Sequence, residues 1–163
     1  NPVLTFWMPA AAALLTGPVY LLLIAKVPKH GPLVILGAVV GTILFATGMY
    51  WGWAAASVAL GAVADVVAGL GRFRAKPLNL RAFIIYSLSP MGSYLMLWAD
   101  PGGYAAYLTG RGTEQAYMDT MARTATAWML PAMVLAAVVC ALISGLVGLR
   151  LLRRQFERAG MTA

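Results

Sequence analysis

The chain has 163 residues, of which 61% are hydrophobic and only 10% charged, with a mean hydropathy of +0.80 and a formal net charge of +7. A soluble domain carries about 45–50% apolar and about 25% charged residues, so this composition excludes a soluble globular protein. Disorder requires low hydrophobicity and high charge, and it is excluded as well. Because the apolar stretches run for about twenty residues instead of alternating over about ten, the sequence predicts an all-α, polytopic transmembrane helical bundle.

Five apolar stretches follow one another along the chain, each close to the roughly 20 residues that a helix needs to cross a bilayer. They are residues 2–25, 32–50, 51–70, 82–98 and 128–149. Residues 1–163 are therefore interpreted as a single transmembrane domain with five visible spans.

The positive charges divide unequally between the two ends of these spans. Five spans place three segments on the same face, namely the loop 26–31, the loop 71–81 and the tail 150–163. These segments carry ten Lys and Arg side chains, whereas the opposite face carries two, Arg111 and Arg123. Cytoplasmic loops carry the Lys and Arg excess, so we expect the basic face and the C-terminus to be cytoplasmic. The net charge then reflects topology and contact with anionic lipid, and no nucleic-acid partner is expected.

This topology puts Asn1 outside the cell, directly before the first span. Either a signal peptide has been removed or an upstream first helix is absent from this chain. We favour the upstream helix, which makes the protein one of six spans, five of them visible.

The segment 99–127 is too polar to cross the membrane. The run DPGG at 100–103 is expected to end the preceding span, because proline and glycine do not continue a helix. Thr113 then suits an N-cap. Tyr117 and Met121 follow at helical spacing, which predicts an outer amphipathic helix that lies over the bundle and runs into the last span.

Enzyme motifs are absent: the sequence contains no zinc-protease, nucleophile-elbow or ATP-binding signature. We therefore expect no enzyme activity and no cofactor belonging to the chain itself. Asp65 is the acid inside a span, and we interpret it as a structural ion pair or helix-end contact near Arg72 and Arg74, with a functional role as the alternative. His30 is interpreted as a surface histidine of the basic loop.

Small residues recur at helix-packing spacing in two neighbouring spans, and such pairs let helices approach closely. Packing within the chain is one interpretation. Docking against a partner membrane protein is the sharper one, and it makes these residues a candidate partner interface: Gly37, Gly41, Ser57 and Gly61.

Aromatic and methionine side chains gather at the ends of the spans opposite the basic loops. Part of this surplus belongs to an interfacial aromatic belt. Belts form on both faces, however, so the asymmetry predicts an apolar pocket, open to the exterior, for a flat or apolar ligand. The candidate substrate-binding residues are Trp7, Met8, Met49, Tyr50, Trp51, Met91, Tyr94, Trp98, Tyr117, Met121 and Arg123. Arg111 and Arg123 are the two cations of this face available to a ligand carboxylate.

Several short segments carry a family resemblance in their order and spacing: GP at 17–18, KVPKHG at 26–31, TGMYW at 47–51, AD at 64–65, GRFR at 71–74 and the basic tail LRRQFERAG at 152–160. Together they resemble the substrate-binding S components of energy-coupling factor (ECF) transporters, in particular the integral membrane group known as MptD or Trep-Strep. The resemblance covers nearly the whole chain.

The resemblance implies a six-helix S component in the bacterial plasma membrane, with both termini cytoplasmic. Such a subunit captures a micronutrient at the outer face (a vitamin, a haem-like tetrapyrrole or a metal chelate). It delivers this substrate through a transmembrane T component driven by two ATPase subunits, which use the ATP. Where the resemblance leads us to expect a histidine after the glycine of the outer turn, this chain has Met49. If the ligand is haem, Met49 is the candidate axial ligand, since methionine serves that role.

A different class of function stays open: a membrane scaffold or assembly subunit without a ligand of its own. A small molecule bound after purification favours the S component, whereas an empty protein bound stoichiometrically to an unrelated complex favours the scaffold. An intramembrane enzyme ranks third, because the sequence lacks a catalytic set.

Overall fold

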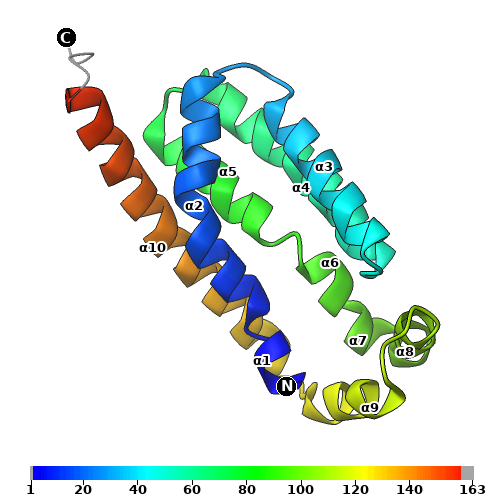
Figure 1. The fold of residues 1–163 in the computed structure, drawn as a ribbon. Coiled ribbons are helices and arrows are strands. Elements are labelled where there is room, and N and C mark those ends of the chain that lie inside the picture. Colours follow the sequence, from blue (N-terminus) through cyan, green and yellow to red (C-terminus); the bar gives the residue numbers. More distant parts are fainter. Residues whose placement is uncertain (1, 159–163) are drawn as a thin grey trace.

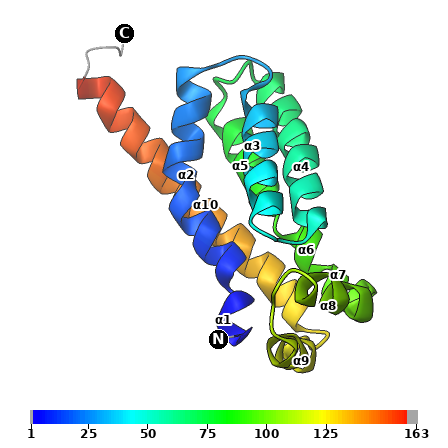
Figure 2. The same cartoon turned by 45° about the vertical axis from the view of Figure 1, so that its right-hand side comes forward.

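A computed structural model describes the backbone of residues 2–158 and the side chains of residues 4–154. Within that part of the chain every regular element is a helix. The long helices lie beside one another as a bundle, and the short helices gather at one end of it (Figures 1 and 2). This confirms an all-α, polytopic helical membrane protein. In chain order the helices are α1 (Pro2–Thr5), α2 (Met8–Lys26), α3 (Pro32–Ala46), α4 (Trp51–Leu70), α5 (Lys76–Ser87), α6 (Met91–Tyr94), α7 (Met96–Ala99), α8 (Pro101–Thr109), α9 (Gln115–Thr124) and α10 (Met129–Arg158).

Four segments are long and apolar enough to cross a membrane: α2, α4, the α5–α7 segment Lys76–Ala99, and Met129–Arg154 within α10. The predicted span at residues 32–50 is helical only as α3, whose 15 residues rise about 22 Å against a hydrocarbon core of about 30 Å. The helix stops there because the chain turns at Gly48, whose φ is 91°. Even so, α3 runs beside α4 from one end of the bundle to the other (Figure 1).

The two ends of the bundle differ in chemistry, as the sequence predicts. The loops 27–31 and 71–75 and the end of α10 lie at one end, called here the basic end (Figure 1). The turn 47–50, α1 and the helices α6 to α9 lie at the opposite end, called here the aromatic end. Arg158, counted with the basic end in the sequence, has a side chain outside the described residues.

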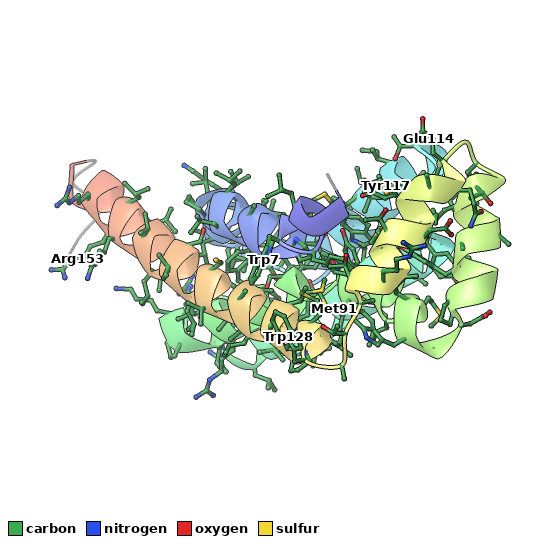
Figure 3. The ribbon with its side chains drawn as sticks, turned by 90° about the horizontal axis from the view of Figure 1, so that it is seen from below. Trp7, Met91, Glu114, Tyr117, Trp128 and Arg153 are labelled. Carbon is green, nitrogen blue, oxygen red and sulfur yellow. The ribbon has the colours of Figure 1, made fainter. Side chains whose placement is uncertain are left out.

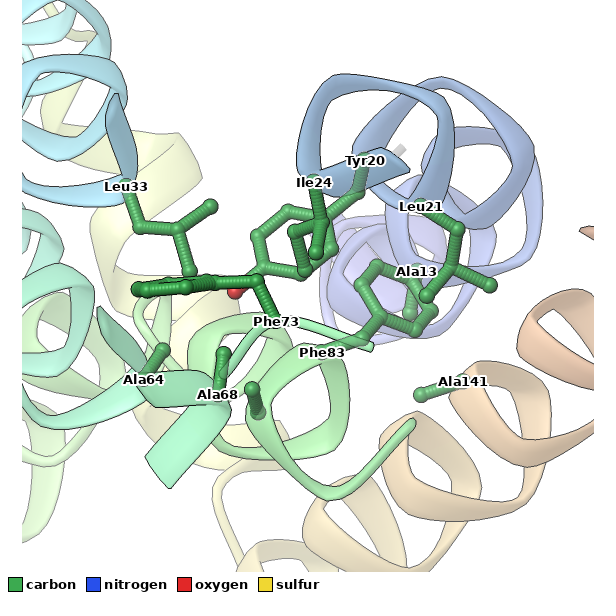
Figure 4. Close-up of a cluster of buried hydrophobic side chains, with 11 residues drawn as sticks. Ala13, Tyr20, Leu21, Ile24, Leu33, Ala64, Ala68, Phe73, Phe83 and Ala141 are labelled. Carbon is green, nitrogen blue, oxygen red and sulfur yellow. The ribbon is translucent and has the colours of Figure 1, made fainter. Parts of the chain in front are cut away.

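Buried side chains form one cluster near each end of the bundle. At the basic end Phe73 lies among Leu33, Ile24 and Ala64, which come from three different helices (Figure 4). At the aromatic end the cluster is rich in thioethers, which adapt to irregular gaps. Its methionines are Met91, Met118, Met121, Met129 and Met133.

The joint between α2 and α10 depends on a proline. Pro18 lies inside α2 and has no N–H, so the helix itself cannot donate to the carbonyl oxygen of Leu14. The Ser144 hydroxyl of α10 donates to that oxygen at 2.6 Å and accepts from the Gly17 N–H at 3.1 Å. A Cβ on Gly17 would lie 2.3 Å from Ser144 Oγ, so glycine is needed for the approach. One side chain therefore satisfies the backbone around the proline and joins two helices.

The four small residues assigned to a partner interface pack within the chain instead. Gly37 and Gly41 of α3 and Ser57 and Gly61 of α4 are all buried between these two helices. A Cβ on Gly37 would lie 2.2 Å from the Ser57 carbonyl oxygen. The spacing that lets helices approach closely is thus used by α3 and α4 for each other, and these residues offer no free surface to a partner.

Asp65 of α4 is buried, and both of its carboxylate oxygens contact the loop before α3. Oδ2 lies 2.8 Å from His30 Nδ1, and Oδ1 accepts from the Gly31 N–H at 3.0 Å. The helix-end contact expected from the sequence is present, because Gly31 is the N-cap of α3. Its side-chain partner is His30, rather than Arg72 or Arg74, and the two elements are fixed to each other at the basic end.

The predicted span 82–98 begins earlier and is broken. Its helix starts at Lys76 and ends at Ser87, and Pro90 precedes α6. Proline interrupts the helix because it has no N–H to donate. Beyond the break Gly92 lies against Gly52 of α4, where a Cβ on either glycine would lie 2.4 Å from the other's carbonyl oxygen. The break therefore lets α6 pack directly on α4 at the aromatic end.

The polar segment 99–127 stays at the aromatic end, but as two helices rather than one. The Asp100 carboxylate accepts from the Gly103 N–H at 2.9 Å and caps α8, while Pro101 takes the first helical position. The run expected to end one helix thus also begins the next. Helix α9 starts after Glu114 instead of Thr113, and residues 125–128 separate it from α10.

We predict that Ser144→Ala lowers the free energy of unfolding by about 1–2 kcal/mol, because the Leu14 carbonyl loses its donor inside the bundle. The measurement is the apparent Tm of the purified protein in one fixed detergent. Thr16→Ala is the matched control, since the Thr16 hydroxyl is exposed and bonds to Ala12 of its own helix. Equal Tm shifts in the two variants would contradict the role assigned to Ser144.

Candidate binding cavity at the aromatic end

A cavity of about 530 Å³ opens at the aromatic end. That volume lies within the range of small-molecule sites, which is roughly 300–1,000 Å³. Its wall combines α1 and α2, the turn before α4, α6, α8, the loop 110–114 and α9. The lining residues are Thr5, Met8, Thr47, Gly48, Met49, Tyr50, Trp53, Ser93, Tyr94, Tyr104, Leu108, Arg111, Gly112, Thr113, Glu114, Tyr117 and Met121.

Aromatic rings form one side of this cavity. The Tyr50 ring meets Tyr104 edge-on, with centroids 5.2 Å apart, and meets Tyr107 edge-on at 5.1 Å. Edge-to-face packing of this kind is the arrangement that aromatic quadrupoles favour. The turn before α4 is thereby fixed to α8, so two elements distant in sequence form a continuous aromatic wall.

Tyrosine hydroxyls connect the helices around the cavity. The Tyr94 hydroxyl of α6 donates to the Thr5 carbonyl oxygen at 3.0 Å, and the Tyr117 hydroxyl of α9 hydrogen-bonds the Thr5 side chain. The hydroxyls of Tyr104 and Ser93 lie 3.1 Å apart. Burial raises the pKa of Tyr104, which keeps its hydroxyl neutral and able to donate at physiological pH.

Two charged side chains of opposite sign line the cavity. The Arg111 guanidinium lies over the rings of Phe45 and Tyr107, at 5.0 and 5.1 Å from their centroids, and donates to the Phe45 carbonyl oxygen at 3.3 Å. Glu114 is exposed at the start of α9, beside Tyr117 (Figure 3). Cation–π contacts hold Arg111 against the wall while leaving the charge at the mouth of the cavity.

This wall is suited to binding a ligand more than to transforming one. It offers ring faces and thioethers for an apolar body, hydroxyls for hydrogen bonds, the Arg111 cation for an acidic group and the Glu114 carboxylate for a basic one. The described residues contain no cluster of three or more His, Cys, Asp or Glu side chains that suits a metal ion. The wall groups able to ligate haem iron are the methionine thioethers, Met49 among them, and the tyrosine hydroxyls.

The structure brings together six of the candidate binding residues and leaves five apart. Those that line the cavity are Met8, Met49, Tyr50, Tyr94, Tyr117 and Met121. Those that do not line it are Trp7, Trp51, Met91, Trp98 and Arg123.

The five remaining candidates lie outside the cavity for different physical reasons. Trp7, Trp51 and Arg123 are exposed on the outside of the bundle, and the two tryptophans suit an interfacial belt. Met91 is buried in the core behind the wall. Trp98 of α7 packs edge-on against Phe6, which also contacts the Tyr94 ring, so Trp98 belongs to the buried cluster beside the cavity.

Several wall residues were absent from the candidate set. Tyr104 and Trp53 belong to the same aromatic surplus in the sequence, so that signal was sufficient to find them. Of the two arginines expected to meet a ligand carboxylate, Arg111 lines the cavity and Arg123 does not, because the unexpected helix α8 carries the loop 110–114 to the cavity. Ser93 lines the cavity because the helix breaks at Pro90. The sequence pattern does not predict how the chain is directed after this break.

Comparison with known proteins adds one finding. The family model described as "Hypothetical bacterial integral membrane protein (Trep_Strep)" matches residues 1–158. No curated protein and no solved structure matches the chain. The family part of the resemblance seen in the sequence is thereby confirmed.

We predict that Tyr94→Phe loosens α1, because the Thr5 carbonyl loses its donor from α6 while the ring packing stays. Hydrogen–deuterium exchange should then be faster across residues 4–8, by up to about fivefold for a bond worth about 1 kcal/mol. Tyr107→Phe is the matched control, since the Tyr107 hydroxyl is buried without a hydrogen-bond partner. Unchanged exchange in Tyr94→Phe would show that this hydroxyl does not hold α1.

Proposed function

We propose that this chain, which belongs to the Trep_Strep family of hypothetical bacterial integral membrane proteins, is the substrate-binding S component of an ECF-type importer. The observation that carries the proposal is the cavity at the aromatic end. Four tyrosines and three methionines line it, together with Arg111. A wall of this composition favours a compact, partly flat ligand with an acidic group.

The orientation follows from the charges. Nearly all Lys and Arg side chains lie at the basic end, which the positive-inside rule assigns to the cytoplasm. The cavity is then open to the exterior, the side from which an importer takes its substrate. The C-terminus is cytoplasmic in this arrangement.

Energy for import has to come from partners. The sequence contains no ATP-binding loop, so we propose that the chain associates with a transmembrane T component and two ATPase subunits that use ATP. We also propose that the chain is not an enzyme. Its histidine and its buried acid contact each other at the basic end, away from the cavity.

The substrate class that the wall supports is a micronutrient with an apolar or aromatic body: a vitamin, a haem-like tetrapyrrole or a metal chelate. Met49 is exposed at the wall and is the thioether that we assign to a haem iron if haem is the substrate. Haem in that case is cargo and not a resident cofactor.

Topology is the first test. In a Cys140→Ala background, an impermeant maleimide applied to intact cells should label a cysteine placed at Thr113 and spare one placed at Lys76. Thr113 lines the cavity and Lys76 lies at the basic end. Labelling only at position 76 would show the opposite orientation, in which the cavity does not open to the exterior.

Ligand retention is the second test. Protein purified from its native membranes should yield a stoichiometric small molecule on solvent extraction, identified by mass spectrometry. The Met49→Ala variant should retain several-fold less of this molecule per protein, because the substitution removes a wall contact worth about 1 kcal/mol. Leu95→Ala is the matched control, since Leu95 is 43% exposed and Met49 39%, and Leu95 does not line the cavity. Equal retention by both variants would exclude this cavity as the site.

Partner association is the third test. The tagged chain, solubilised from native membranes in mild detergent, should co-purify with one further membrane subunit and two ATPases. Uptake of the extracted small molecule by cells should stop when those ATPases carry inactivating substitutions. An empty chain bound stoichiometrically to an unrelated complex would instead favour the scaffold function.

A further inference from the structure

A second cavity lies at the basic end, at the opposite end of the bundle from the cavity at the aromatic end. It has a volume of about 390 Å³ and lies between α2, the loop 71–75, α5 and α10. Figures 1 and 2 show α10 diverging from α2 towards this end. Its lining residues are Leu21, Ala25, Pro28, Phe73, Arg74, Lys76, Asn79, Leu149, Leu152 and Arg153.

The polar part of this lining is positively charged. Arg74, Lys76 and Arg153 come from three different elements and no carboxylate lines the cavity. The described acid nearest in the fold, Asp65, is already engaged by His30 and the Gly31 N–H. Lys76 also begins α5, a 12-residue helix whose N-terminal dipole favours an anion.

Asn79 holds the loop 71–75 in place at the side of the cavity. Its side chain lines the cavity and is only 8% exposed. Its Nδ2 donates to the Phe73 carbonyl oxygen at 2.9 Å. This bond joins the loop that carries Arg74 to the helix that carries Lys76.

The loop beside the cavity is strained. Arg72 and Phe73 have φ angles of 50° and 60°, in the left-handed region that side-chain-bearing residues rarely adopt. Such conformations persist only where the surroundings impose them. The bonds from the Phe73 N–H to Ala68 and from Asn79 to the Phe73 carbonyl hold this loop in shape.

The apolar part of the lining identifies the rest of the ligand. Leu149 and Leu152 of α10 and Leu21 of α2 form an apolar surface that continues from the charged groups towards the spans. Charges at the ends of spanning helices lie at the depth of lipid headgroups, where Lys and Arg attract anionic lipid. A free phosphate would use the cations and leave this apolar surface uncovered.

We propose that this cavity binds an anionic phospholipid, with phosphatidylglycerol as the representative. The phosphate contacts Arg74 and Lys76 beside Arg153, and an acyl chain lies along Leu149 and Leu152. The site is independent of the transport proposal, because it shares no lining residue with the cavity at the aromatic end.

Native mass spectrometry of the delipidated full chain in a neutral detergent tests the proposal. Dioleoylphosphatidylglycerol should bind at one site, and more tightly than dioleoylphosphatidylcholine with the same chains. Arg74→Gln combined with Lys76→Gln should weaken that binding by about tenfold. Arg81→Gln is the matched control, since Arg81 is an exposed cation of α5 that does not line the cavity.

Three results would overturn the proposal. Equal affinity for the two lipids would exclude headgroup recognition. Equal weakening by Arg81→Gln and by the double variant would place the lipid elsewhere. Inorganic phosphate that displaces the lipid at similar concentration would identify a free-anion site. Ligand extraction from the aromatic end is unaffected by these results, so failure here is distinguishable from failure of the proposed function.

Discussion

A backbone carbonyl inside a bilayer has no water to bond to, so every proline within a spanning helix requires a compensating donor or a place where irregular backbone is covered by protein. Pro18 is compensated by the Ser144 hydroxyl, which fixes α2 to α10. Pro90 follows the other course: the helix ends, and the chain resumes as α6 packed against α4. The arrangement of the whole bundle depends on these two solutions.

The cavity at the aromatic end follows from the second solution. Because α6 leaves the line of α5, Ser93 and Tyr94 turn towards the interior. There the Ser93 hydroxyl hydrogen-bonds the Tyr104 hydroxyl, and the Tyr94 hydroxyl donates to the Thr5 carbonyl oxygen. The opposite end has the reverse character. There the Asp65 contact with the α3 N-cap closes the bundle, and cations rather than tyrosines surround the remaining space. One bundle thus has two chemically distinct ends.

The sequence predicts the features that depend on composition and on near neighbours. Apolar length predicts four of the five expected spans, Lys and Arg counts predict the basic end, and the aromatic and methionine surplus predicts part of the cavity wall, Met49 and Tyr50 included. It does not predict which of two small-residue surfaces face each other, so Gly37 was assigned to a partner although Ser57 covers it. Nor does it predict α8, because the DPGG run both ends and begins a helix, and the position of Arg111 depends on α8.

The methionine thioethers of the aromatic end also differ in their exposure to oxidants. Met8 and Met49 are exposed at the cavity, whereas Met118 and Met133 are buried behind it. Oxidation converts methionine to a polar sulfoxide that reductases can reverse. Oxidants that reach this end therefore modify Met8 and Met49 before the buried methionines. The two exposed methionines thereby protect the buried cluster from oxidation.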